Sequence, residues 1–354
     1  MRITFILPGF IRIPMGGVKI VQEYANRLAQ RGHAVTLVYP LELKTGNRFY
    51  DLKKKLSSLL DKLNHVAEEL YYTPAPEVNV LVVKQVTSRY IPEGDAVVAV
   101  GWQTAAAMLD LPEIHGRKFY LLQSFETYFS NAAKILQTYR LPLKKITISQ
   151  WIIDELALLG EQGFGPLGNA IDPDEFYLTE TNQARPFDVI FLYHPHRIKG
   201  ARAGLNILRS LKRNYPECRV VIVAARQPVH RFPKWIELRI RPSVAELREL
   251  YNSAKILLHT SRWEGWGLPV MEAMACGCSV VAWRNRGVQE FLQHESNALL
   301  VPIGDLDASQ AALQTLLHDG ALRARLRDEG LKTVKEYDWP GIIDQLENIL
   351  QSEI

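Results

Sequence analysis

Apolar and polar residues follow a pattern along the chain that predicts alternating strands and helices. Short apolar runs, each bounded by turn residues, are followed by longer stretches in which apolar residues recur every third or fourth position. This order is typical of parallel sheets covered by helices. The strands predicted in the first half are Ile3–Leu7, Val35–Val38, Val78–Val83, Ala96–Val100, Lys118–Leu122 and Lys145–Ile148.

A second series of the same kind follows a break in the pattern. The stretch 163–174 is rich in Gly, Pro, Asn and Asp, which form turns, so it predicts an interdomain linker. We therefore expect two α/β domains, 1–165 and 170–338, followed by a last helix in 340–354. No residue-level repeat relates the halves, so they share architecture only. The strands predicted in the second half are Asp188–Tyr193, Arg219–Val223, Ile236–Ile240, Ile256–His259, Ser279–Ala282 and Ala298–Val301.

Length and composition fit a two-domain globular enzyme. The 354 residues exceed what one hydrophobic core usually organises, and 47% apolar with 23% charged residues is ordinary for a soluble protein. No apolar run reaches the roughly 18 residues that cross a bilayer. The apolar start Met1–Gly9 is too short for a signal peptide and has no small-residue cleavage site after it.

Cysteine content and charge narrow the expected compartment and partners. Three cysteines are too few for a disulfide scaffold, which favours a reducing cytoplasm. The net charge of +4 suits anionic phosphates or an acidic membrane face, and it is too small to indicate nucleic acid.

The strongest chemical signal is the segment 261–277, directly after a predicted strand. Pro269 is suited to the first position of a helix and Gly277 to the residue that ends it. Gly265 and Gly267 let the backbone approach a ligand closely, and the start of a helix attracts anions. The segment therefore predicts a phosphate site.

Two carboxylates flank this turn. Glu264 precedes the glycines, on the loop that would meet a sugar, and Glu272 lies in the second turn of the predicted helix. A carboxylate there can accept two hydrogen bonds from a ribose diol. The alternative is that both are surface carboxylates on an ordinary turn, but two acids around Gly-Trp-Gly-Leu-Pro seldom arise by chance.

The segment resembles the Glu, seven residues, Glu motif of glycosyltransferase family 4, the retaining GT-B enzymes of group 1. The resemblance implies that Glu264 contacts donor-sugar hydroxyls, that Glu272 holds the ribose and that the turn between them lines the donor. It also implies two Rossmann-like domains whose parallel sheets face across an interdomain cleft. The first domain would bind the acceptor, with helix 340–354 packed back on it. The implied turn residues are Gly265, Trp266, Gly267 and Leu268.

Further matches extend over most of the chain. Gly16-Gly17-Val18 is similar to the family's N-terminal loop, which approaches the donor diphosphate, although a Gly-Gly turn alone can be purely conformational. Lys199 followed by glycine matches a family Lys-Gly pair, but the arginine usually found five residues earlier is His194. Either Arg197 or His194 would then supply the missing contact to phosphate. Weaker resemblances lie in 31–35, 169–176, 287–290 and 297–302.

No metal or other cofactor is expected. Asp172-Pro-Asp174 spells the metal-binding motif of another glycosyltransferase fold, yet it lies among turn formers in the predicted linker. Cys276 and Cys278 flank a helix end without further ligands, which favours core packing. The diphosphate of a donor would then be neutralised by protein groups.

On the acceptor side the sequence departs from the family pattern. Many members carry a His-Asp pair where this chain has Gln123 and Glu126, an arrangement similar to a rhamnosyltransferase-like branch. These two residues and Trp102 are the acceptor-side candidates, with core packing as the alternative for Trp102. The basic segment 52–63 predicts an amphipathic helix that rests on anionic lipid at the inner membrane face or is merely a solvated face.

The sequence thus predicts a retaining hexosyltransferase of polysaccharide or glycoconjugate synthesis. It would move a sugar from a nucleoside diphosphate sugar, UDP-linked by frequency, to a saccharide or lipid-linked acceptor. The predicted catalytic residues are Glu264, Lys199 and Arg197. A nucleotide-sugar 2-epimerase and a non-catalytic sugar-nucleotide-binding subunit remain alternatives. A dehydrogenase is disfavoured because no Gly-x-Gly-x-x-Gly follows the first strand.

Overall fold

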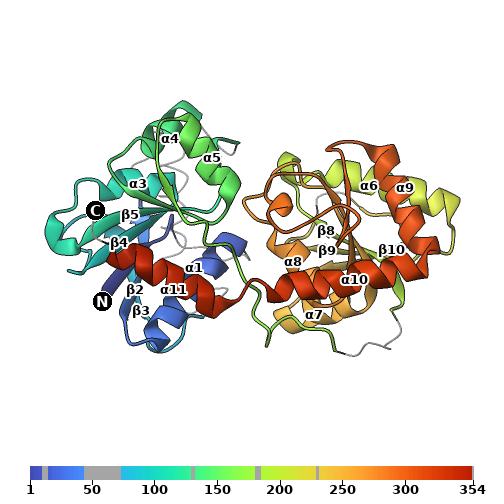
Figure 1. Cartoon of the computed structure of the whole chain (residues 1–354), viewed down its shortest axis with the longest axis horizontal. Coiled ribbons are helices and arrows are strands. Elements are labelled where there is room, and N and C mark those ends of the chain that lie inside the picture. The colour runs from blue at the N-terminus through green and yellow to red at the C-terminus, as the bar shows by residue number, and fades with distance from the viewer. Residues whose placement is uncertain (10–14, 44–72, 129–131, 180–184, 229–230, 353–354) are drawn as a thin grey trace. The chain divides into compact units, whose positions relative to one another are not determined.

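The computed structural model (Figure 1) divides into two compact units. The first comprises Met1–Gly168 and Ile342–Ile354, and the second Asn169–Gly341. The residues that the structure describes are 1–9, 15–43, 73–128, 132–179, 185–228 and 231–352.

The first unit is built on a parallel sheet of seven strands in the order β3-β2-β1-β4-β5-β6-β7. The alternation of apolar runs and helical stretches is confirmed as a βα fold. The strands are β1 (Arg2–Ile6), β2 (Ala34–Glu42), β3 (Asn79–Gln85), β4 (Ala96–Val100), β5 (Arg117–Leu122), β6 (Lys144–Thr147) and β7 (Gly163–Phe164). The helices are α1 (Gly16–Gln30), α3 (Trp102–Met108), α4 (Ala132–Tyr139), α5 (Gln150–Leu158) and α11 (Trp339–Gln351), with short 3-10 turns η2 (Glu113–His115) and η3 (Glu126–Tyr128).

Strand β7 lies at the start of the stretch 163–174, in which the sequence predicts turns and no strand. Gly163 pairs with Lys145 of β6. A Cβ at Gly163 would lie 3.1 Å from the Ile153 side chain and 3.2 Å from Thr147, so glycine here permits close packing rather than a turn. An edge strand of two residues has no apolar run to reveal it.

The second unit is built on a parallel sheet of six strands in the order β10-β9-β8-β11-β12-β13. The strands are β8 (Phe187–Tyr193), β9 (Val220–Ala224), β10 (Ile236–Ile240), β11 (Ala254–His259), β12 (Ser279–Trp283) and β13 (Leu299–Val301). The helices are α6 (Ala201–Asn214), α7 (Val244–Asn252), α8 (Leu268–Ala275), α9 (Leu306–His318) and α10 (Gly320–Lys335), with 3-10 turns η4 (Arg197–Lys199) and η5 (Val288–Glu290).

Both sheets have the doubly wound order of a Rossmann-like fold. In the first, the order reverses between β1 and β4, and in the second between β8 and β11. Loops that leave the carboxyl ends of two such strands diverge to opposite faces, which opens a crevice where ligands bind in this class of fold. Binding and catalytic residues are therefore expected in the loops after β1, β4, β8 and β11.

Helix α11 belongs to the first unit from Ile342 onward and lies beside α1 (Figure 1). Arg31, just after α1, pairs with Asp344 at 2.5 Å and with Glu347 at 2.8 Å. His33 Nε2 lies 2.8 Å from the same Glu347 carboxylate, so this histidine helps to hold α11 in place. Leu346 on the opposite side of the helix is 1% exposed, so α11 is part of the core as well as of the surface.

No helix among the described residues is long and apolar enough to cross a membrane. The predicted basic helix 52–63 lies outside the described residues, so its contact with lipid stays a prediction.

Leu346→Ala should destabilise the first unit by about 2 to 4 kcal/mol, because it opens a cavity under α11. The matched control is Asn348→Ala at an exposed position of the same helix, which should stay within about 0.5 kcal/mol of wild type. Urea unfolding measures both. Equal midpoints for the two variants would show that α11 adds nothing to the core.

Candidate functional site

The turn after β8 is clamped to the loop after β11. Gly200 has φ +66°, and a Cβ there would lie 1.9 Å from the Thr260 carbonyl oxygen, so the two backbones touch. The amide of Arg262 donates to the Ile198 carbonyl at 2.7 Å. Lys199, between these contacts, is therefore presented from a fixed backbone at the point where the strand order reverses.

The loop after β11 leads into α8 as the sequence predicts. Gly267, with φ +119°, caps the helix, and Pro269 occupies its second position rather than its first. Gly277, with φ +77°, follows the last turn. The amide of Val270 donates back to the Gly267 carbonyl at 2.8 Å. The predicted glycine-flanked helix start is thus present.

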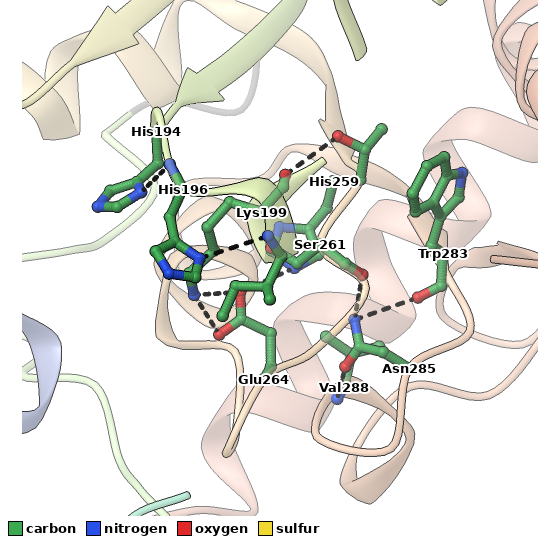
Figure 2. A network of polar contacts seen from close by, with 11 residues as sticks. His194, His196, Lys199, His259, Ser261, Glu264, Trp283, Asn285 and Val288 are labelled. Atoms are coloured by element: carbon green, nitrogen blue, oxygen red, sulfur yellow. Dashed lines mark hydrogen bonds and ion pairs between the residues drawn. The ribbon is translucent and has the colours of Figure 1, made fainter. Parts of the chain in front are cut away.

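The loop after β12 holds this segment from below, as Figure 2 shows. Asn285 Nδ2 donates to the Ser261 carbonyl at 3.0 Å, and its Oδ1 accepts from the Val288 amide at 3.2 Å. A Cβ on Gly287 would lie 2.5 Å from the Glu264 carbonyl oxygen. Sequence reasoning missed Asn285, whose role depends on two loops that are distant in sequence.

Lys199 and Glu264 form a close ion pair (Figure 2). Lys199 Nζ lies 2.7 Å from Glu264 Oε1 and 2.8 Å from Oε2. The Glu264 side chain is only 10% exposed. Burial alone would raise the pKa of this carboxyl, but Lys199, His259 and a bond from Ser261 outweigh it and hold the pKa below its usual value.

Two histidines border this pair. His259, the last residue of β11, has its Nε2 3.5 Å from Glu264 Oε1. Burial, with a smaller contribution from the Lys199 charge, lowers the pKa of His259 to about 4 despite the opposing effect of Glu264. Partial burial, followed by the charges of Lys199 and His196, lowers the pKa of His194. Arg197 is exposed, on the same turn as Lys199.

The two other predicted side chains of the motif have different surroundings. Glu272 is partly exposed on α8 and accepts a bond of 3.3 Å from the buried Tyr251 hydroxyl. Trp266 points into the core, where its Nε1 donates to the Met271 sulfur at 2.8 Å and its ring packs 5.6 Å from that of Phe291. Any ligand contact at Trp266 must therefore come from its backbone. Gly265 and Leu268 are partly exposed.

The remaining predicted donor contacts, Gly16, Gly17 and Val18, lie in the first unit. They form the first turn of α1, which has no side-chain cap, and Val18 is buried. A Cβ on Gly17 would lie 2.4 Å from Gln123 Oε1, so the first turn of α1 and the loop after β5 meet here. Gln123 Nε2 is buried and forms no hydrogen bond with any residue that the structure describes.

Glu126 forms short hydrogen bonds at the same carboxyl-terminal end of the strands of the first sheet. Its Oε2 accepts from the Tyr120 hydroxyl at 2.6 Å and from the Trp102 amide at 2.9 Å. Burial outweighs these bonds and raises the pKa of Glu126 to about 7. The Trp102 side chain is only 7% exposed, with Lys134 Nζ 5.7 Å from its ring centroid, which favours the core-packing alternative.

The residues that the sequence offers as possible metal ligands lie in a turn and in the core. The amide of Asp174 donates to Asp172 Oδ1 at 2.9 Å, which closes a turn. Cys276 and Cys278 are buried, and burial raises the pKa of both thiols. Among the described residues, no group of three or more His, Cys, Asp and Glu side chains is arranged to hold a metal ion.

Known proteins with similar sequences point to one family. Residues 183–333 match the family model described as Glycosyl transferases group 1. The phosphatidyl-myo-inositol mannosyltransferase of Mycolicibacterium smegmatis is 23% identical over 377 residues, covering 99% of this chain and 94% of that protein. In six other curated relatives, the matched segment spans 8 to 32% of the relative's own length.

Solved structures show the same fold over the whole chain. HepE of Anabaena, in complex with UDP-glucose, has a TM-score of 0.72 at 16% identity and covers 100% of both chains. A mutant of TarM of S. aureus, in complex with fondaparinux, alpha-GlcNAc-glycerol and UDP, has a TM-score of 0.72 at 12% identity and covers 99% of this chain and 100% of that one. The fold is therefore GT-B. The second unit thus matches the group 1 glycosyltransferases over residues 183–333; the rhamnosyltransferase-like branch stays a prediction.

Gly200→Ala should destabilise the second unit by at least about 2 kcal/mol more than a matched control, because its Cβ would strike the Thr260 backbone. The control is Gly304→Ala, which has φ +87° but meets only the Arg262 side chain at 3.6 Å. Its cost should be the conformational one of about 1 to 2 kcal/mol. Urea unfolding compares them, and equal losses would show that the clamp carries no strain-sensitive contact.

Glu126→Gln should remove a pH-dependent loss of stability. With a folded-state pKa of about 7, above the reference of 4.5, the stability from the protonated carboxyl is full below about pH 4.5 and is lost as pH rises through about 7. Between about pH 5 and 8 the variant should therefore gain on the order of 2 kcal/mol relative to wild type. Urea unfolding at both pH values measures this. Glu113→Gln, at an exposed position of the same unit, should show no such trend, and a flat Glu126→Gln difference would contradict the raised pKa.

Proposed function

We propose that this protein transfers a sugar from a nucleoside diphosphate sugar, held by the second unit, to a saccharide or lipid-linked saccharide acceptor. The observation that carries the proposal is the Lys199–Glu264 pair, which lies where the strand order reverses. An ammonium and a carboxylate at that point can bind the two unlike parts of such a donor. The ammonium suits the diphosphate, and the carboxylate suits the hydroxyls of the sugar.

Positive charge for the departing diphosphate would come from protein groups. Lys199 supplies one charge, and exposed Arg197 on the same 3-10 turn supplies another. The start of α8 after Gly267 adds the partial positive charge of a helix N-terminus. We propose that these groups, fixed in place before the reaction, stabilise the leaving group without a metal ion.

Glu272 would hold the ribose. It is partly exposed on the second turn of α8, and the Tyr251 hydroxyl bonds to one of its oxygens. The HepE structure with UDP-glucose supports a donor that carries a uracil base and a hexose. Retention of the anomeric configuration rests on the family resemblance, and the attacking hydroxyl would pass its proton to the departing phosphate.

The acceptor would bind at the corresponding edge of the first sheet. Gln123 and Glu126 follow β5 there, and the Trp102 amide anchors one oxygen of Glu126. The other oxygen, Oε1, lies near Gly101, where a Cβ would be 3.5 Å away. An amide and a carboxyl of this kind can bond sugar hydroxyls in place of the family's His-Asp pair.

A panel of nucleotide sugars in a thermal-shift assay should identify the donor. A ligand at 100 times its dissociation constant stabilises by about 2.7 kcal/mol. Wild-type protein should then hydrolyse that donor or transfer its sugar to an acceptor. Alteration of the donor sugar itself without acceptor would indicate a 2-epimerase, and binding without turnover would indicate a non-catalytic subunit.

Glu272→Ala and Glu264→Gln should separate binding from turnover. Loss of the bonds between Glu272 and the ribose should weaken nucleotide binding by roughly 10- to 100-fold, since each bond to a charged group contributes about 1.5 to 3 kcal/mol. Glu264→Gln should lower kcat by about tenfold or more while the affinity for free UDP changes less than about threefold. Calorimetry and initial rates measure the two effects.

The matched control for both variants is Glu217→Ala, an exposed glutamate of the same unit, which should match wild type in binding and rate. Unaltered nucleotide binding by Glu272→Ala would remove the ribose assignment.

A further inference from the structure

His259 is a buried side chain with an unexplained polar atom. The residue is 8% exposed, and its Nε2 forms no hydrogen bond with any residue that the structure describes. Buried polar atoms are nearly always paired, so each exception calls for a physical reason. The nearest charged oxygen, Glu264 Oε1, lies 3.5 Å away, just beyond a good hydrogen bond.

The Glu264 carboxylate has one movable and one fixed neighbour. Lys199 Nζ donates to both carboxylate oxygens, at 2.7 and 2.8 Å. Its long side chain is 30% exposed. His259 sits on strand β11 itself, between β8 and β12 in the middle of the sheet. Lys199 can therefore swing away without disturbing the fold, whereas His259 cannot. Figure 2 shows the three side chains gathered at one point.

We propose that His259 is a positioning residue that takes over Glu264 when the diphosphate of the donor draws the Lys199 ammonium away. The inference rests on the proposed function, in which Lys199 binds that diphosphate. A shift of about half an ångström would bring Nε2 into hydrogen-bond range of Oε1. Oε2 would then be released for a sugar hydroxyl, while the carboxylate stays oriented on its loop.

The charges around His259 give this exchange a measurable signature. The charged groups that face the ring are Glu264, from the loop after β11, and Lys199, from η4; His194, after β8, interacts with both of these. Burial and Lys199 lower the pKa of His259 to about 4, and Glu264 acts in the opposite direction. Once phosphate neutralises Lys199, the attraction of Glu264 remains, so the pKa must rise. Donor binding should then take up part of a proton below neutral pH.

Calorimetry tests this with UDP-glucose, or with the nucleotide sugar that gives the largest thermal shift in the panel. Such a diester has no phosphate group that titrates near pH 6. Titrations at about pH 6 in buffers of different ionisation enthalpy report the proton uptake of wild type, which should vanish near pH 8. His259→Gln keeps an N–H donor of similar reach that cannot titrate. It should bind the donor within about threefold of wild type. Its proton uptake should be smaller than that of wild type, and what remains belongs to groups such as His194, whose pKa Lys199 also lowers.

Two further variants separate positioning from packing. His259→Leu provides neither donor nor proton, so kcat should fall by about tenfold or more while free UDP binds within about threefold of wild type. His259→Gln should recover most of that rate. His194→Gln, which removes another titratable ring near Lys199, should keep the part of the proton uptake at about pH 6 that belongs to His259.

Several results would overturn the inference. Undiminished uptake in His259→Gln, uptake abolished only in His194→Gln, or a His259→Leu variant as fast as wild type would each do so. If the leucine variant fails to fold, the uptake measured on His259→Gln decides alone. Failure of wild type to bind any nucleotide sugar of the panel is a separate result, because it rejects the donor assignment and with it the premise of this inference.

Discussion

The close approach of two backbone segments in the second unit is the constraint on which its chemistry depends. Gly200 leaves no room for a side chain against the Thr260 carbonyl, and the Arg262 amide reaches back to the same turn. This contact fixes where Lys199 and Glu264 begin, so that their side chains meet although they are 65 residues apart in sequence. Without it, an ammonium and a carboxylate would be two surface charges contributing little.

The same design recurs in the first unit with different residues. The first turn of α1 and the loops that leave β4 and β5 meet near the point where the strand order reverses, and Gly17 there leaves space for the Gln123 amide. Polar groups are again buried at a sheet edge, including a carboxyl whose pKa is raised to about 7. Low exposure strengthens each interaction and makes each unpaired polar group costly.

The sequence predicts local features well and tertiary ones poorly. Periodicity locates strands such as β4 and β10 to the residue, and the spacing of Pro269 and Gly277 places α8. It does not show that Trp266 turns inward, because a tryptophan between two glycines has no periodic context. The sequence also does not identify the neighbours of His259. A polar residue at the end of a buried strand indicates a site only when the facing loop is known. Local pattern cannot supply contacts that folding creates between distant loops.

The return of the chain to its first unit also governs how that unit is made. Residues 342–352 complete a core whose sheet is encoded within the first 168 residues, and all of the second unit is synthesised in between. During synthesis, the surface of the N-terminal sheet that receives α11 therefore stays uncovered until the whole second unit has been made. A premature stop anywhere in the second unit would leave the first unit unfinished as well, and such exposed apolar surface is what chaperones bind.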